Sequence, residues 1–169
     1  MRRLLVAVIG AAGISMLAAA CGNGSTGGPS GTTSAPAAPS SASTAGSSAT
    51  ISLHAISGVP GKALVDGGGR TLYLFEADKG GKSACSGACA AAWPPVTVTG
   101  SPHASGGVSQ AMLGTIHRSD GAEQVAYNGH PLYYYSGDTE AGDDNGQGSK
   151  AFGAGWYAVA ASGKKIDTD

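Results

Sequence analysis

The sequence predicts an all-β fold, in which two pseudo-repeat four-stranded antiparallel units pack as one domain, with a short helix near a pair of cysteines. Three observations predict it: an internal repeat, matching turn signals in the two copies, and short apolar runs between the turns. Packing the units together buries the apolar face of each. We expect this domain over 51–167, with a first copy over about 51–99 and a second copy over about 111–162.

The two copies align at an offset of 60 residues. Residues 64–78 and 124–138 then share five identities, and Phe75 aligns with the aromatic residue Tyr135. Further along the chain the offset grows to 63, and Trp93 aligns with Trp156. Such self-similarity indicates two structural units of one design.

Turn signals divide each copy into strands. Asn128-Gly129 separates two strand-like runs and is a strong two-residue hairpin signal, because both positions need positive φ. We expect Gly68-Gly69 to make the equivalent turn in the first copy. A fourth strand is predicted near 93–98 and again near 156–160. The Ala-rich stretch 86–93 is expected to form a short helix that ends at Pro94-Pro95.

The N-terminus is typical of an export signal. Residues 1–20 combine a basic start with an uncharged apolar run and end in small residues before Cys21. The alternative, a membrane-spanning helix, needs about 20 apolar residues, and this run is shorter and interrupted by Gly. The segment resembles a bacterial lipoprotein signal peptide, which implies that Cys21 carries the lipid (palmitate) and becomes the mature N-terminus.

A tether is predicted between the lipid and the domain. All but one of residues 22–50 are Gly, Ser, Thr, Ala or Pro, and none is charged or aromatic. Such a composition buries too little apolar surface to repay its ordering entropy. We therefore expect 21–50 to be a lipidated cysteine followed by a disordered tether, with O-glycosylation left open by its Ser and Thr content.

A short motif occurs in both copies. It has the form Tyr-x-aromatic-x-x-Asp, and a tryptophan follows it in each copy. The motif residues are Tyr73, Phe75, Asp78 and Trp93 in the first copy, and Tyr133, Tyr135, Asp138 and Trp156 in the second. With this motif the domain resembles a family of bacterial lipoproteins, the secreted repeat of unknown function. The resemblance implies an exported, often lipid-anchored protein with tandem repeats and no established reaction, substrate or partner.

Cys85 and Cys89 form an even pair once Cys21 is lipidated. In an oxidising compartment such a pair is first interpreted as a disulfide. The second copy lacks it, so any chemistry of these cysteines belongs to the first copy. The alternative is a redox or metal-handling domain, in which the two thiols act alone or with two histidines. The candidate histidines are His54, His103, His117 and His130.

Other groups of residues suggest chemistry less strongly. The acidic loop 138–146 has enough carboxylates for calcium but not the EF-hand spacing, so a solvated turn is the preferred interpretation. The tyrosines of the second copy are expected to be core, with stacking of a sugar or a quinone-like ring as the alternative. The repeated Asp78 and Asp138 suit turn-capping side chains. We find no catalytic constellation and predict no enzyme, no cofactor and no metal.

Composition limits the class of partner. The chain has 169 residues, 12% charged residues and a formal net charge of -1, without a cluster of Lys or Arg, which argues against nucleic-acid binding. We expect a lipid-anchored protein at the outer face of the bacterial cell membrane, acting as a non-enzymatic binding or structural module. Its partner would be a surface protein, the wall or a small-molecule ligand, besides the membrane that holds its lipid.

Overall fold

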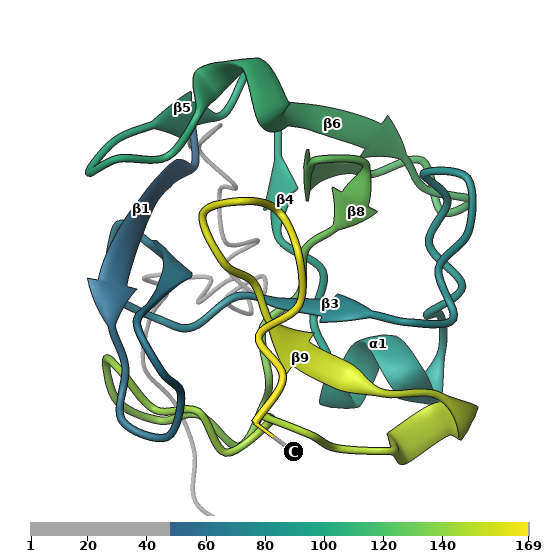
Figure 1. The fold of residues 1–169 in the computed structure, drawn as a ribbon. Helices are drawn as coiled ribbons and strands as arrows, with labels where there is room; N and C mark the ends of the chain where they lie inside the picture. The colour runs from purple at the N-terminus through teal and green to yellow at the C-terminus, as the bar shows by residue number, and fades with distance from the viewer. Residues whose placement is uncertain (1–47, 169) are drawn as a thin grey trace, which may run out of the picture. The chain divides into compact units, whose positions relative to one another are not determined.

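The computed structural model describes residues 48–168, which are mostly strand and turn with one α-helix (Figure 1). The predicted signal peptide, Cys21 and nearly all of the predicted tether lie outside the described residues. The elements, in chain order, are β1 (Thr50–Ala55), β2 (Lys62–Asp66), β3 (Tyr73–Phe75), α1 (Ala88–Ala92), β4 (Thr97–Val98), β5 (His103–Ala104), η1 (Gln110–Met112), β6 (Leu113–His117), β7 (Glu123–Tyr127), β8 (His130–Pro131), η2 (Ala151–Gly153) and β9 (Trp156–Ala158).

The strands form three sheets. Their orders are β2-β1-β5, β3-β9 and β4-β7-β6, and β8 adds to the last sheet by pairing with β7. The β1–β5 pair is parallel, and the other pairs of named strands are antiparallel. The all-β prediction is therefore confirmed, with one small helix and two repeats.

The sheets do not divide into two four-stranded units, one for each copy, as the sequence predicted. β3 of the first copy pairs with β9 of the second, with Leu74 opposite Tyr157. β4 of the first copy likewise pairs with β7 of the second, with Thr97 opposite Gln124. Each copy thus satisfies strand edges of the other, and unpaired edges are what a small β-domain must avoid. Local turn signals predict the hairpins but say nothing about these exchanged pairs.

The two equivalent turns differ in length. Asn128 and Gly129 connect β7 and β8 as the predicted two-residue loop, with φ values of 49° and 78°. In the first copy the loop is 67–69, one residue longer than predicted, and of its glycines only Gly69 has a positive φ. The Asp66 carboxylate accepts backbone N–H groups in and just after this loop. These side-chain bonds hold the loop with one residue of positive φ, where the two-residue turn of the second copy has two.

The one α-helix is a single turn. α1 spans Ala88–Ala92, shorter than the predicted 86–93, and ends at Trp93 before the two prolines. Its buried residue is Cys89. The helix therefore places one cysteine and the following tryptophan against the interior.

Two core clusters fill the domain on opposite faces of its central strands. All residues of β3 are buried, with Tyr73 and Phe75 in one cluster and Leu74 in the other. The aromatic core includes Tyr73, Phe75, Cys85, Cys89, Trp93, Tyr133 and Trp156. The aliphatic core includes Ile51, Leu64, Leu72, Leu74, Val96, Val98, Val125, Leu132 and Val159, together with Tyr127. β3 is thus a central strand: its sequence is apolar on both faces, and both faces are buried.

Candidate functional site

The motif tyrosines and aspartates bond across the two copies. Tyr73 donates its hydroxyl to Asp138 at 2.7 Å, and Tyr133 donates its hydroxyl to Asp78 at 2.8 Å. The backbones of the two tyrosines also exchange N–H···O bonds of 2.9 and 3.0 Å. Equivalent residues therefore face each other about a local pseudo-two-fold axis, and each copy completes the motif of the other.

The motif aromatic rings form one stack. Phe75 lies on Trp156 with ring centroids 4.0 Å apart, and Trp156 lies on Trp93 at 3.9 Å. Trp93 in turn contacts Tyr135 at 4.4 Å with a tilt of 35°. The rings come alternately from the first and the second copy, so the stack is shared equally. Large aromatic faces buried in this way contribute strongly to stability. Because these rings pack on one another, their stacked faces are not available to a ligand.

The two motif aspartates also hold the loops that follow them. Asp78 accepts the backbone N–H of Ala84 at 2.7 Å, and Asp138 accepts that of Asn145 at 3.0 Å. Burial raises the pKa of both carboxyls, and these hydrogen bonds offset part of the rise. Burial also raises the pKa of Tyr133 above its ordinary value, so its phenol stays protonated and donates. The geometry is that of structural caps.

The two cysteines form a disulfide within the aromatic core. Cys85 and Cys89 are bonded to each other and are only 1% and 7% exposed. A redox-active cysteine normally lies in a partly exposed, electropositive setting. The bond instead closes the turn that leads into α1, next to Trp93.

A buried arginine holds the same segment and was not singled out from the sequence. The Arg118 guanidinium donates to Ser83, to Gln124 and to the Cys85 carbonyl, each at 2.8 Å. Ser83 also contacts the Tyr133 hydroxyl at 2.7 Å, which connects this network to Asp78. At the register position of Arg118 the first copy has glycine, so the network is present on one side of the pseudo-axis. A lone arginine before a turn gave no sequence signal for it.

The acidic loop directs its carboxylates to its own backbone. Asp143 accepts the N–H groups of Thr139 and Glu140, each at 2.9 Å, and these bonds lower its pKa. Asp138 is occupied by Tyr73 and Asn145, as described above. Of the candidate histidines, His54, His103 and His117 are exposed and His130 is partly buried. Over residues 48–168, no three His, Cys, Asp or Glu side chains come together as a metal-binding group.

A pocket of about 400 Å³ opens at the end of β3. We call it the β3 pocket, and its wall is mainly apolar. It is lined by Leu74, Phe75, Glu76, Asp78, Lys79, His130, Lys164 and Lys165. Its size lies in the range of roughly 300–1,000 Å³ found for small-molecule sites. It could not be predicted from the sequence, because Lys79, His130 and Lys164 come from segments that are far apart in the chain.

The charges around the β3 pocket are unequally neutralised. Lys165 pairs with Glu76 at 3.0 Å and with Asp167 at 2.9 Å, which raises the pKa of Lys165. Lys79 donates to a backbone carbonyl at 2.9 Å. No carboxylate of residues 48–168 forms an ion pair with Lys79 or Lys164. The rim therefore carries two cations that the described residues leave without a counter-charge.

The equivalent place beside Asp138 is occupied by the protein itself. Arg70, at the register position of His130, places its guanidinium 3.9 Å from the centre of the Tyr134 ring. The acidic loop lies against it, because Gly142 donates to the Gly69 carbonyl at 3.0 Å. The two copies are thus equivalent at the motif but differ next to it. The open pocket lies beside Asp78, and the equivalent place beside Asp138 is filled.

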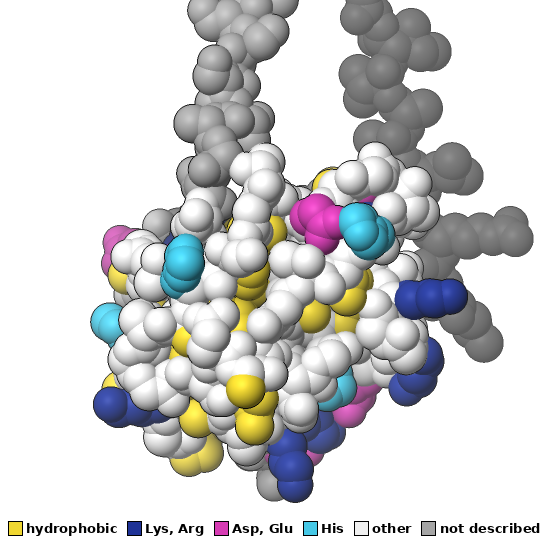
Figure 2. Space-filling view, turned by 90° about the horizontal axis from the view of Figure 1, so that it is seen from above, with side chains coloured by type: hydrophobic (Ala, Val, Ile, Leu, Met, Phe, Trp, Pro, Cys, Tyr) yellow, Lys and Arg dark blue, Asp and Glu magenta, His cyan; other side chains and the backbone are white. Residues whose placement is uncertain are grey.

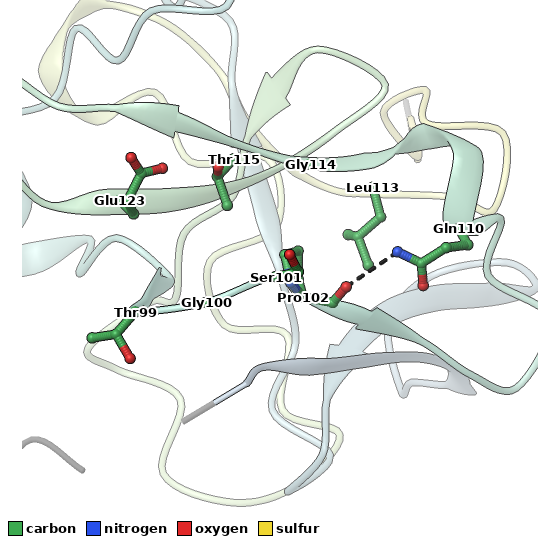
Figure 3. Close-up of a pocket in the computed structure, with 9 residues that line it drawn as sticks. All are labelled: Thr99, Gly100, Ser101, Pro102, Gln110, Leu113, Gly114, Thr115 and Glu123. Atoms are coloured by element: carbon green, nitrogen blue, oxygen red, sulfur yellow. Dashed lines mark hydrogen bonds between the residues drawn. The ribbon is translucent and has the colours of Figure 1, made fainter. Parts of the chain in front are cut away.

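A second hollow is polar. It lies between the 99–102 segment and strands β6 and β7, and Figure 3 shows Thr99 and Ser101 across from Thr115 and Glu123. Gln110 closes one end and donates to the Pro102 carbonyl at 3.1 Å. This groove, also of about 400 Å³, has no aromatic ring in its lining. It offers hydroxyls and one carboxylate, without the combination of cations and apolar wall found in the β3 pocket.

The surface drawn in Figure 2 shows how charge is distributed on one face. Lys and Arg side chains lie around the margin, and hydrophobic side chains show between them. Two large hydrophobic residues of the described region are exposed, Met112 at 39% and Phe152 at 49%. None of the helices among residues 48–168 has the length and apolar character that crossing a membrane requires.

Comparison with known proteins agrees with the repeat. A family model described as a secreted repeat of unknown function matches residues 55–97 and again residues 114–160. No curated protein and no solved structure matches the chain significantly. The two matched segments make up more than half of the chain and coincide with the two copies that build the aromatic core. The chain therefore belongs to the secreted-repeat family of unknown function.

Proposed function

We propose that this protein is a lipid-anchored, non-enzymatic binding module at the outer face of the bacterial cell membrane. The family supports an extracellular location. The small residues before Cys21 and the Gly-, Ser- and Ala-rich stretch after it support a lipid and a tether at the N-terminus. Two or more acyl chains hold a protein at a membrane without a spanning helix.

The observation that supports a binding function rather than catalysis is that the motif residues bond to one another. The four polar motif side chains, Tyr73, Asp78, Tyr133 and Asp138, bond to one another across the copies, and the motif rings stack together. The side chains that repeat in this chain thus join its two copies. The β3 pocket combines the motif residues Phe75 and Asp78 with residues that do not repeat, such as Lys164 and His130, and it supports a ligand site.

The anchor is tested with the full chain expressed in a bacterial host together with Cys21→Ala. After metabolic labelling with a clickable palmitate analogue, we expect label and membrane fractionation for the wild-type chain and neither for the variant. Cys89→Ala serves as the matched cysteine control and should keep its label. Label on the Cys21→Ala variant, or unlabelled wild-type chain, would refute lipidation at Cys21.

The binding function is tested on the full chain carrying Cys21→Ala, isotopically labelled for NMR. A fragment library should produce shifts of the backbone amides of Leu74, Phe75 and His130 without chemical change of the fragment. Fragments that are turned over would instead assign an enzyme. A free thiol pair at Cys85 and Cys89 after oxidising export would favour the redox alternative.

A further inference from the structure

We propose that the β3 pocket binds a small organic acid, meaning an anionic group carried on a flat apolar body. This inference rests on the proposed binding function and adds the chemical class of the ligand. It follows from three features of the pocket: cations at its rim, acids that are already satisfied, and a wall that is mainly apolar.

The rim favours an anion. Lys79 and Lys164 line the pocket and have no carboxylate partner within residues 48–168, so their charges face the pocket or solvent. His130 lies at the same rim and adds a further nitrogen donor. A carboxylate or sulfonate placed here would gain charge-assisted hydrogen bonds, which are stronger than neutral ones.

The two acids in the lining do not cancel this preference. Glu76 is paired with Lys165 at 3.0 Å. Asp78 accepts the Tyr133 hydroxyl at 2.8 Å and the Ala84 N–H at 2.7 Å, so both of its oxygens are engaged. The charge of Glu76 is therefore neutralised by Lys165, the oxygens of Asp78 are occupied by hydrogen bonds, and the ammonium groups of Lys79 and Lys164 remain for a ligand.

The wall favours an apolar body attached to the anion. Leu74 and Phe75 end β3 at the floor of the pocket, and the methylene stems of the lysines extend the apolar surface under their charged heads. The equivalent place beside Asp138 shows the same preference with protein groups, since Arg70 lies over the Tyr134 ring at 3.9 Å. Beside Asp78 the register positions of Tyr134 and Arg70 are taken by Leu74 and the shorter His130, and both of these residues line the open pocket.

The test uses three probes that share one ring system. Naphthalene-2-carboxylate, naphthalene-2-methanol and 2-(aminomethyl)naphthalene are titrated into the full chain carrying Cys21→Ala, with the amides of Leu74, Phe75 and His130 as NMR reporters. We expect the carboxylate to bind most tightly and the cation most weakly. The carboxylate affinity should fall as salt is raised, because exposed charges are screened.

Variants locate the charges. Lys79→Gln with Lys164→Gln should weaken carboxylate binding about fivefold to tenfold and leave the neutral probe unchanged. The matched control, Lys62→Gln with Lys82→Gln, removes two lysines that do not line the pocket and should change affinity by less than about twofold. An equal loss in both double variants would refute a site-specific role for the rim lysines.

The outcomes separate this inference from the proposed function. If all three probes shift the pocket amides with equal affinity, the pocket is a binding site and the preference for acids is wrong. If no probe shifts them, the inference fails and the binding function loses this site. Vesicles of phosphatidylglycerol distinguish a lipid source, because pocket shifts with these vesicles and none with free naphthalene-2-carboxylate would overturn the small-acid proposal.

Discussion

The two copies are equivalent at the motif and different directly beside it. On the side of Asp138 the protein covers its own surface: Arg70 lies over Tyr134, and the acidic loop bonds to Gly69 and Thr71. Around Asp78 the corresponding surface is a pocket, with His130 in place of the arginine. The same motif therefore supports one closed side and one open side.

This difference distinguishes residues that hold the two copies together from residues that line the pocket. Residues that occur in both copies lie at the interface between them, where Tyr73 and Tyr133 exchange both backbone and side-chain bonds. Residues without an equivalent in the other copy, such as His130 and Lys164, line the open pocket. In a duplicated fold the unrepeated residues are thus the place to look for a ligand.

The largest effect is expected from removing a ring of the shared stack. Trp93→Ala should lower the free energy of unfolding by about 3–5 kcal/mol, because it leaves a cavity against Tyr135 and Trp156. Urea denaturation followed by circular dichroism measures it, with Trp93→Phe as a milder variant that should still fold. Met112→Ala, at an exposed site, should stay within about 0.5 kcal/mol. A loss as small as that control would contradict a stack shared by both copies.

The disulfide should give the next largest effect, and it belongs to the first copy alone. Replacing Cys85 and Cys89 together with alanine should cost about 2 kcal/mol, because a short loop of sequence separation 4 is no longer closed in the unfolded chain. Thermal unfolding measures the loss, while binding of naphthalene-2-carboxylate should persist at temperatures where the variant is folded. Unchanged stability together with lost binding would show that the cysteines serve ligand binding rather than stability.

A smaller effect is expected from opening the closed side. Arg70→Ala should cost about 0.5–1 kcal/mol, the range for a cation on a partly exposed ring. His130→Ala, its counterpart, should change stability by about 0.5 kcal/mol or less, because it borders a pocket. Paired urea titrations compare the two variants. Equal losses would mean that His130 packs as Arg70 does and that the two sides differ less than the contacts indicate.

The smallest effect concerns pH and should have the same sign in both copies. Burial raises the pKa of Asp78 and Asp138 in the folded state, so the unfolded chain loses these protons first as pH rises. Each carboxyl therefore reduces stability as pH climbs from the ordinary aspartate range to the raised folded-state pKa. The stability of Asp138→Asn relative to wild type should rise over that interval, and Asp78→Asn should behave alike. Urea titrations at a series of pH values measure it, and opposite slopes would break the equivalence of the two motifs.

Much of the fold could be predicted because its signals are local or repeated. The offset of 60 residues indicated two units, Asn128-Gly129 indicated a hairpin, and the apolar 72–75 stretch indicated a central strand. The disulfide followed from having two cysteines in an exported chain. The exchanged pairing of β3 with β9 could not be predicted, because backbone hydrogen bonds between distant segments leave no pattern in either sequence.

The candidate site was beyond sequence reasoning for the same reason. Lys79, His130 and Lys164 come from three segments that are far apart in the chain, and each alone is an ordinary polar residue. The buried Arg118 gave no signal either, since its partners Ser83 and Gln124 come from different segments.

The sequence by itself determined the repeat, the all-β class, the motif and the family, because periodicity, turn chemistry and composition act over short stretches of chain. Only the tertiary structure decided that each motif is completed by the opposite copy and that one side remains open. Those outcomes depend on which distant side chains fill the same volume: Arg70 fills it over Tyr134, and the shorter His130 leaves it to a pocket.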